Sequence, residues 1–231
     1  MIHLQKIVMK KYAVIVAGGS GSRMNNNLPK QFILIRNKPV LYYTIQSFLN
    51  SFDDMNIILV LPEEHIAKGQ EIIDGYFHNS SIQIISGGRT RFHSVQKGLS
   101  LIKDESIIFV HDGVRCLLSK ELIHRCYESA LKSGTAIPVI KSIDSIRITL
   151  GDENESIDRN RVMMVQTPQT FHSKIILAAY NIDYKDKFTD EALVVEAYGL
   201  KVHLIEGDAA NFKITTEKDL KIVEALLPQE L

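Results

Sequence analysis

The chain has no net charge, because 27 Lys and Arg side chains balance 27 Asp and Glu side chains across its 231 residues. No overall field is available to gather nucleic acid or an anionic membrane, so any anion site must be built locally. Long apolar runs are also missing. The longest, such as Ile57 to Leu61, fall far short of the roughly 18 residues that a bilayer span needs. We therefore expect a soluble protein with neither nucleic acid nor a membrane as its partner.

Cysteine is scarce: Cys116 and Cys126 are too few for a disulfide framework, and they lack metal-ligand spacing, which suits a reducing cytoplasm. The eight histidines are scattered, without an H-E-x-x-H motif or a His/Cys cluster. Residues 1–9 lack the small-residue cleavage site of a signal peptide. The sequence predicts a cytoplasmic protein without a zinc site built from its own side chains.

Apolar residues make up 45% of the chain, enough for a sizeable core, and its length favours one domain over residues 1–231. Short β-branched runs alternate with amphipathic stretches, which is typical of βαβ units. We predict a doubly wound α/β fold with a mostly parallel sheet. The predicted strands are 12–17, 56–61, 82–86, 106–111, 135–140 and 201–205. The predicted helices are 39–52, 63–77, 91–102, 120–133, 173–181, 190–198 and one after Thr216, which has a capping-box-like start with Asp219.

One segment, from about 141 to 164, breaks this alternation. Two short extended pieces, Ser145 to Leu150 and Val162 to Val165, flank the polar stretch Gly151 to Ser156. This pattern predicts a hairpin-like excursion with a hydrophilic tip, too small to be a domain. The pattern alone leaves two interpretations open, a surface loop or an arm that reaches another subunit.

The strongest local signal follows the first predicted strand, where Ala17 to Phe32 have the sequence AGGSGSRMNNNLPKQF. Gly18, Gly19 and Gly21 have no Cβ to block a ligand, and their N–H groups can converge on phosphate oxygens. The dinucleotide fingerprint G-x-G-x-x-G and the P-loop motif G-x-x-x-x-G-K-[ST] are both absent. The segment predicts an anion cradle of another kind.

Two cations, Arg23 and Lys30, lie in the same segment, which Pro29 stiffens. A planar guanidinium and a compact ammonium beside one phosphate cradle suit a polyphosphate that undergoes substitution. Without the glycines, either residue would be interpreted as a solvated loop charge.

Seven further blocks follow in order. They are GGRTRFHSV at 87–95, VHDGVR at 110–115, DSIR at 144–147, IDRN at 157–160, QTPQTF at 166–171, TDEA at 189–192 and EGDAANFKITTEKDL at 206–220. With the glycine segment, they resemble the 2-C-methyl-D-erythritol 4-phosphate cytidylyltransferase family of the non-mevalonate isoprenoid pathway, from Lys11 to Leu227. The chain departs from the family at Cys116, where proline is usual, and at Gly113 and Val114, which replace small alanines.

The resemblance implies a Rossmann-like nucleotidyltransferase fold and transfer of a cytidylyl group from CTP to a polyol phosphate, with release of pyrophosphate. A phosphate monoester has a second pKa of about 6, so the nucleophile arrives ionised and needs no general base. The reaction calls instead for cations and for Mg²⁺, which we expect the phosphates mainly to hold. The family forms homodimers in which the arm reaches the partner's site.

The resemblance also assigns roles by motif position. Its catalytic residues are Arg23 and Lys30 at the α-phosphate, and Lys213 and Arg159 at the incoming phosphate. Its CTP-binding residues are Ala17, Gly18, Gly19, Gly21, Gly88, Ser94 and Asp112. Its acceptor-binding residues are Asp112, Arg115, Ser145, Thr167 and Thr189. Ser145, Arg159 and Arg115 are the residues expected to act in the partner's site.

Structural roles compete with some of these assignments. Asp112 ends a predicted strand, where ligands gather in a parallel sheet, so a binding role is favoured over a role in a turn. Lys213 precedes a capped helix and, taken alone, would be a solvated lysine. We interpret His111 as a packed strand residue, and Arg91 and His93 as candidates for the polar face of a helix.

Three other functions remain to be weighed. The nearest changes only the acceptor, to ribitol 5-phosphate, because that related cytidylyltransferase shares these blocks. A second is an NAD(P)-dependent short-chain oxidoreductase, but the dinucleotide-binding fingerprint of such an enzyme is absent from this sequence. A third is a non-catalytic nucleotide-binding regulator, which would give no reason to keep Arg23, Lys30 and Lys213 together.

Overall fold

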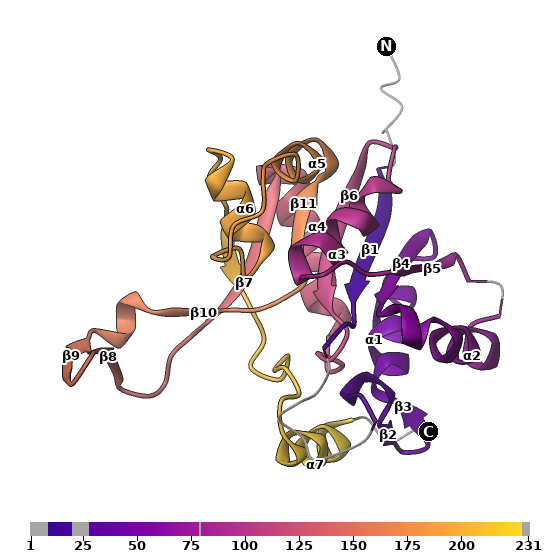
Figure 1. Cartoon of the computed structure of the whole chain (residues 1–231), viewed down its shortest axis with the longest axis horizontal. Coiled ribbons are helices and arrows are strands. Elements are labelled where there is room, and N and C mark those ends of the chain that lie inside the picture. Colours follow the sequence, from indigo (N-terminus) through magenta and orange to yellow (C-terminus); the bar gives the residue numbers. More distant parts are fainter. Residues whose placement is uncertain (1–8, 20–27, 79, 228–231) are drawn as a thin grey trace, which may run out of the picture.

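Aliphatic and β-branched runs form the central strands of a mixed sheet (Figure 1). The computed structural model describes residues 9–19, 28–78 and 80–227. Four strands lie parallel in the order β6-β1-β4-β5. They are β1 (Lys10–Val16), β4 (Met55–Leu61), β5 (Ile82–Ser86) and β6 (Ser106–Asp112).

The sheet continues beyond β6 with strands of both directions. Next to β6 comes β11 (Gln169–His172), antiparallel to it, and then β7 (Thr135–Lys141). Strand β10 (Met163–Val165) pairs antiparallel with β7, and β12 (Leu204–Glu206) pairs parallel with it. The predicted α/β class with a mostly parallel sheet is confirmed.

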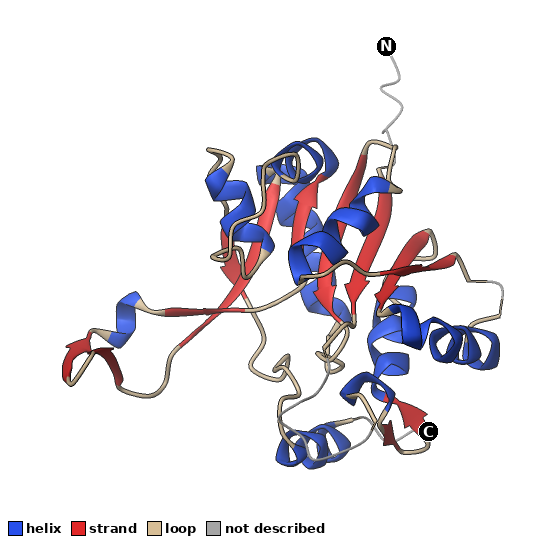
Figure 2. Cartoon of the chain, in the orientation of Figure 1, coloured by secondary structure: helices blue, strands red, loops and turns tan. Residues whose placement is uncertain are grey.

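Helices cover both faces of the sheet (Figure 2). Successive side chains of a strand point to opposite faces. Ile57 and Leu59 of β4 therefore belong to one core cluster, whereas Ile58 and Val60 belong to another. The first cluster includes α1 (Val40–Leu49), α2 (Ile66–Tyr76) and α4 (Lys120–Ser133), and the second includes α3 (Arg91–Ser100), α5 (Ser173–Ala179) and α6 (Glu191–Ala197).

The order of the strands reverses beside β1. The chain passes from β1 to β4 and β5 on one side, and then α3 returns it to β6 on the other side of β1. In open α/β sheets, such a reversal leaves a crevice at the carboxyl ends of the strands, where ligands bind. The topology thus selects the edge formed by the ends of β1, β4, β5 and β6 as the place for a site.

Smaller elements close this edge. The 3₁₀ helices η1 (Lys30–Phe32) and η2 (Glu63–His65) follow β1 and β4, and a short hairpin joins β2 (Leu34–Ile35) to β3 (Lys38–Pro39). The C-terminal helix α7 (Glu217–Leu226) packs through Val223 against Ile35 and Val40. Its start has the predicted capping box between Thr216 and Asp219.

The excursion after β7 extends away from the rest of the molecule (Figure 1). It contains β8 (Ile146–Leu150), β9 (Glu153–Ile157) and the 3₁₀ helix η3 (Arg159–Arg161), with β8 and β9 paired antiparallel. A hairpin-like excursion is therefore present, but its second strand is β9 rather than the predicted piece 162–165, of which 163–165 form β10 and pair with β7. The prediction of a polar tip over residues 151–156 was too wide, because β9 occupies most of it and the turn is confined to Gly151 and Asp152.

Other predicted bounds were close, apart from one strand start and three strands that were missed. Strand β12 starts at Leu204 rather than at residue 201, because only 204–206 pair with β7. Strand β11 and the short strands β2 and β3 were not predicted at all. None of the helices in the described ranges is long and apolar enough to cross a membrane.

Two helical glycines make a matched test of this packing. A Cβ on Gly98 of α3 would lie 2.7 Å from Cγ1 of Val14 in β1, whereas a Cβ on Gly75 of α2 would meet no atom within 4 Å. We expect Gly75→Ala to raise the free energy of unfolding by up to about 1 kcal/mol through helix propensity. Gly98→Ala should lower the free energy of unfolding by about 1–2 kcal/mol, because overpacking against Val14 outweighs the gain in helix propensity. Urea denaturation measures both, and changes of equal sign would contradict the close α3–β1 contact.

Candidate active site

The carboxyl ends of the four parallel strands surround a cavity of about 570 Å³. After β1 the chain continues through Ala17, Gly18 and Gly19, and all three line the cavity. A Cβ on Gly18 or Gly19 would meet no atom within 4 Å, so both glycines border open space. The other walls come from the ends of β4, β5 and β6. The cavity therefore lies where the strand order reverses, as the topology requires.

The turn between β5 and α3 forms one wall, and a serine holds its shape. The Ser94 hydroxyl accepts a hydrogen bond from the Gly88 N–H at 3.0 Å and donates to the Thr90 carbonyl at 2.9 Å. A Cβ on Gly88 would lie 2.4 Å from that of His93, so no larger residue fits there. Thr90 caps α3 by accepting from the His93 N–H. These bonds place Arg91, the first residue of α3, at the cavity.

Asp112, the last residue of β6, is the centre of a cluster of cations. Its Oδ1 accepts from Arg91 Nη2 at 3.2 Å, and its Oδ2 lies 2.9 Å from Lys213 Nζ and 3.7 Å from Arg115 Nε. Burial alone would raise the pKa of Asp112, but Arg91, Lys213 and Arg115 outweigh it and hold the pKa well below its usual range. Asp112 is a permanent anion that orients three cations.

Arg91 is itself held from the other side by Glu191, the first residue of α6. The Arg91 Nη1 group donates to Glu191 Oε1, and Nη2 donates to Oε2 at 3.1 Å. Burial would lower the pKa of Arg91, but Glu191 and Asp112 raise it above its usual value, so the guanidinium stays charged. Complete burial raises the pKa of Glu191, and Arg91 opposes that rise. Arg91 therefore bridges two carboxylates from different elements.

Lys30 and Lys213 approach the cavity from distant parts of the chain. Lys30 Nζ donates to the Ile214 carbonyl at 3.2 Å, which joins η1 to the segment before α7. The Ile214 side chain is fully buried, and its N–H donates to the Val114 carbonyl at 3.1 Å. Both lysines line the 570 Å³ cavity. The backbone contacts of Ile214 thus place two ammonium groups beside the glycines of the β1 turn.

A second cavity, of about 220 Å³, adjoins the first. Arg91, Asp112 and Lys213 line both cavities, so the charged cluster lies at their junction. Arg115 lines the smaller cavity, and its buried Nε has no hydrogen-bond partner in the part of the chain that the structure describes. Two anionic ligands could meet across this cluster.

A chain of hydrogen bonds fixes His111 behind the cluster. Its Nε2 lies 3.1 Å from the Arg115 carbonyl, which can only accept, so this nitrogen carries the proton. Its Nδ1 then accepts from the Thr167 hydroxyl at 2.9 Å, and that oxygen accepts from the Asp112 N–H at 3.1 Å. Burial lowers the pKa of His111 to about 4. His111 is a neutral packed residue, as interpreted from the sequence, and it orients Thr167 and the backbone of Asp112.

The predicted site residues fall into three groups by position. Around the larger cavity the structure places Ala17, Gly18, Gly19, Lys30, Gly88, Ser94, Asp112 and Lys213. Around the smaller cavity it places Asp112, Arg115, Thr167, Thr189 and Lys213. Gly21 and Arg23 lie outside the described residues.

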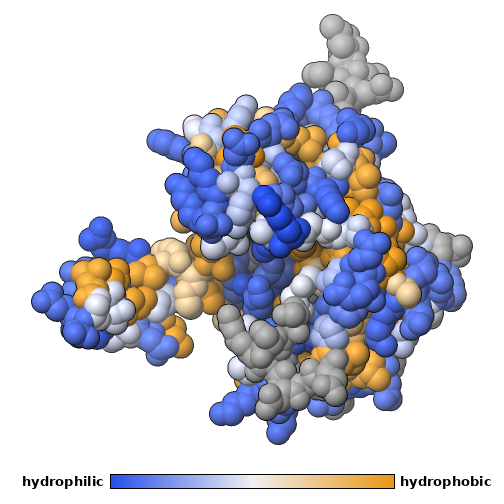
Figure 3. Space-filling model, viewed as in Figure 1, coloured by the Kyte–Doolittle hydropathy of each residue, from blue (hydrophilic) through white to orange (hydrophobic). Residues whose placement is uncertain are grey.

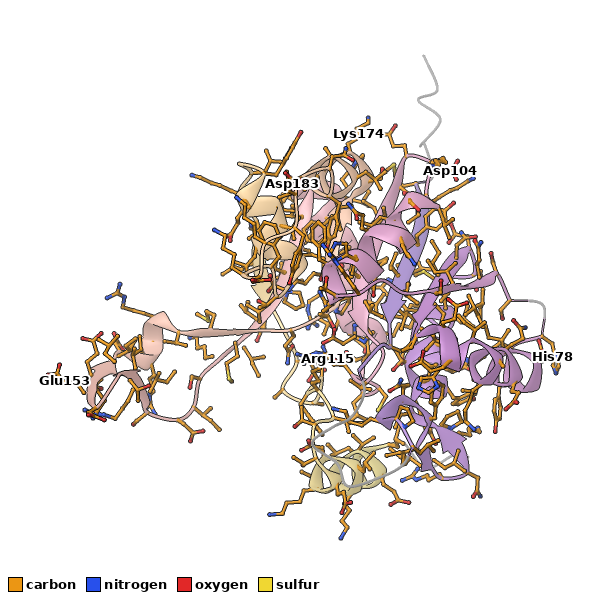
Figure 4. The ribbon with its side chains drawn as sticks, viewed as in Figure 1. His78, Asp104, Arg115, Glu153, Lys174 and Asp183 are labelled. Carbon is orange, nitrogen blue, oxygen red and sulfur yellow. The ribbon has the colours of Figure 1, made fainter. Side chains whose placement is uncertain are left out.

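The third group lies on the arm. Ser145 and Arg159 are exposed, neither lines either cavity, and Arg159 Nη1 donates to the Ile143 carbonyl at 2.8 Å within the arm. Figure 4 shows the same separation, with Arg115 in the middle of the molecule and Glu153 at the outer end of the arm. Within one chain, the structure does not bring Ser145 and Arg159 to the other predicted residues.

Two residues of the cluster were not assigned a role from the sequence. Arg91 was a candidate for the polar face of a helix, but its side chain lines both cavities. Glu191 stood in the TDEA block without a role, and it is fully buried against Arg91. An acid in an otherwise apolar helical face was the only signal for Glu191, and nothing in the sequence pairs it with Arg91.

The described residues contain no group of three or more His, Cys, Asp or Glu side chains that could hold a metal ion. Among the carboxylates that line the larger cavity, Asp112 already has cations at both oxygens, and Glu63 and Glu64 stand on another wall. A cation that arrives on phosphate oxygens fits such a site, because Mg²⁺ is commonly held by substrate phosphates with few protein ligands.

A family model described as 2-C-methyl-D-erythritol 4-phosphate cytidylyltransferase matches residues 11–229. The chain belongs to this family. A relative of that name from Phocaeicola vulgatus is 43% identical over 219 residues, which are 95% of this chain and 100% of the relative. One from Bacteroides fragilis has the same identity and coverage. The family match does not favour the oxidoreductase, regulator or ribitol phosphate alternatives.

Solved structures agree with this family. The 4-diphosphocytidyl-2C-methyl-D-erythritol synthase of Anaerococcus prevotii matches with a TM-score of 0.80 at 28% identity, covering 94% of this chain and 97% of that one. The cytidylyltransferase of Thermus thermophilus matches with a TM-score of 0.75 at 28% identity, covering 94% and 98%. The doubly wound, Rossmann-like fold is therefore shared with this cytidylyltransferase family.

The buried neutral His111 predicts a pH-dependent stability. Unfolded His has a pKa of about 6.5 and the folded residue about 4, so below pH 6.5 the unfolded chain binds a proton that the folded chain does not. Stability is thus lost as the pH falls from 6.5 towards 4, by about 2 kcal/mol between pH 7 and pH 5 from this residue alone. Urea denaturation of the wild type and of His111→Gln at both pH values isolates the effect. Equal losses in the two proteins would contradict it.

Proposed function

We propose that this chain transfers the cytidylyl group of CTP to 2-C-methyl-D-erythritol 4-phosphate, giving 4-diphosphocytidyl-2-C-methyl-D-erythritol and pyrophosphate. The observation that carries the proposal is the pair of adjoining cavities that share Arg91, Asp112 and Lys213. CTP occupies the larger cavity, bordered by the glycines, and the polyol phosphate occupies the smaller one. Their phosphates then meet at the cationic cluster.

The chemistry needs no base from the protein. The acceptor phosphate has a second pKa of about 6 and is largely ionised at neutral pH. One of its oxygens attacks the α-phosphorus of CTP and forms the new P–O bond. The bond to the bridging oxygen breaks, and pyrophosphate leaves with the electron pair in line with the attack. His111, which is buried, neutral and hydrogen-bonded on both ring nitrogens, is not available as a base.

The cations of the site hold the two anions and stabilise the charge that develops between them. Lys30 enters the larger cavity from η1 and assists at the α-phosphate, together with Arg23. Lys213 lies at the junction and holds the incoming phosphate in line. Arg115, which the resemblance had placed in the partner's site, lines the smaller cavity of its own chain beside Asp112 and adds positive charge for the acceptor there. Preorganised positive charge of this kind is the main source of catalysis in phosphoryl transfer.

A divalent cation, Mg²⁺ by preference, enters as part of the nucleotide. When bound, it neutralises charge on the triphosphate and on the departing pyrophosphate. The phosphate oxygens would mainly hold it, because both carboxylate oxygens of Asp112 already face cations of the protein.

The arm is proposed to act in a homodimer. Apolar side chains along it are exposed, with Ile143 80% and Leu150 63% accessible, and Figure 3 shows apolar atoms gathered on the arm and at its base. Such a surface suits burial against a second copy of the chain. Arg159 and Ser145, which reach neither cavity of their own chain, would then complete the partner's site.

The proposed compartment is the cytoplasm. Both cysteines are buried and free, and burial raises the pKa of each thiol to about 12. Free cysteines that form no disulfide with each other are usual in a reducing compartment.

The decisive experiment measures pyrophosphate release with CTP, Mg²⁺ and either of two acceptors. We expect release with 2-C-methyl-D-erythritol 4-phosphate and little with ribitol 5-phosphate, and no release without an acceptor. The reverse preference would assign the related ribitol activity instead, and no release with either acceptor would refute cytidylyl transfer.

Variants in the same assay test the cations. Lys30→Ala and Arg23→Ala should each lower turnover about 100-fold or more, as loss of a charge-stabilising group does in other enzymes. Lys221→Ala, on the exposed side of α7, is the matched control and should behave as the wild type. Near-normal turnover in both site variants would exclude their proposed role.

Mixing of two inactive proteins tests the shared site. In a dimer of Lys30→Ala with Arg159→Ala, one of the two sites combines an intact Lys30 with the partner's intact Arg159. Random exchange of equal amounts should therefore restore about a quarter of the sites. Mass spectrometry verifies exchange, and exchanged subunits without recovered activity would show that each site is built from one chain.

A further inference from the structure

Glu191 is the most deeply buried charge near the cavities, with no exposed surface. A buried carboxylate is costly unless its oxygens are paired. Arg91 occupies both oxygens of Glu191, and the Tyr180 hydroxyl adds a hydrogen bond to Oε1 at 3.3 Å. Neither cavity is lined by Glu191, so it acts on a ligand only through Arg91.

The backbone around Glu191 is held firmly to the sheet. Gln169 of β11 is buried, and its amide donates to the Asp190 carboxylate at 3.1 Å and accepts from the Ala192 N–H at 2.8 Å. These two bonds lie on either side of Glu191 in the sequence. The first turn of α6 therefore presents the carboxylate to Arg91 from a fixed position.

From Glu191, contacts lead in single steps to the junction of the cavities. Arg91 uses its Nη groups on Glu191 and also donates from Nε and Nη2 to Asp112 Oδ1, at 3.3 and 3.2 Å. The second oxygen of Asp112 holds Lys213 at 2.9 Å. A planar guanidinium that one carboxylate holds in place can hold a second carboxylate in place, because its N–H donors have a rigid geometry.

We infer that Glu191 is a positioning residue of the proposed reaction: it locks Arg91, and through Arg91 and Asp112 it sets the place of the Lys213 ammonium group. The inference rests on the proposed cytidylyl transfer. Without Glu191, Arg91 would be free to follow the phosphates of either ligand, and Asp112 would lose its fixed donor.

This role predicts a particular kinetic signature. Glu191 and Asp112 face three cations, so removal of the Glu191 charge makes the cluster more positive. A more positive cluster binds anionic substrates no more weakly, but the loosened Lys213 stabilises the transition state less well. The loss must therefore appear in kcat and not in KM.

The test is the kinetics of Glu191→Gln, which keeps the shape of the side chain. We expect kcat to fall about 10-fold to 100-fold, because small misplacements of catalytic groups slow reactions by such factors. KM for CTP and for the acceptor should stay within about threefold. The matched control is Glu196→Gln, the same change on the exposed side of α6, which should leave both constants unchanged.

A double-mutant cycle distinguishes positioning from a general loss of structure. Arg91→Lys keeps the positive charge but loses the planar guanidinium, so we expect a similar fall in kcat. If the two residues act together, kcat of the double variant should be little lower than that of the more affected single variant. If circular dichroism shows that Glu191→Gln does not fold, Arg91→Lys alone decides, by the same fall in kcat with little change in KM. Normal kcat, a loss confined to KM, or independent effects in the cycle would overturn the inference. A wild type without activity would instead refute the proposed function itself.

Discussion

The site depends on one buried anion, the carboxylate of Asp112. It lies at the end of β6 and meets Arg91 from α3, Arg115 from the following loop and Lys213 from the segment before α7. A buried charge left without partners costs several kcal/mol, so the three segments are constrained to meet around it. The ion pairs that shape the site thus also join the C-terminal segment to the sheet.

The sheet decides where these charges can gather. Its strand order reverses beside β1, which opens the carboxyl edge between β1, β4, β5 and β6. The β1 turn borders one side of that space, and residues from several other elements border the rest. A chain without net charge can therefore hold a strongly cationic centre, because topology concentrates a few of its many charges in one place.

Local signals predicted elements whose residues carry their own pattern. Strand β5 and helix α4 have the bounds expected from periodicity, and the capping box of α7 is present. Strand β11, with the sequence QTFH, was missed because its four residues are ordered by pairing with β6 and β7, not by any alternation. For the same reason the contact of Arg91 with Glu191, across 100 residues, has no trace in either segment.

Carboxylates at the centre of a site for two polyanions look unfavourable, because they cancel part of the attraction. Attraction alone, however, stabilises bound substrates and transition state alike and gives no acceleration. What the reaction needs is positive charge that is already in place when the new P–O bond forms. An alternating series of charges, from Glu191 through Arg91 and Asp112 to Lys213, gives up some binding of anions for fixed orientation of the cations. The buried acids are therefore part of what makes the cations effective.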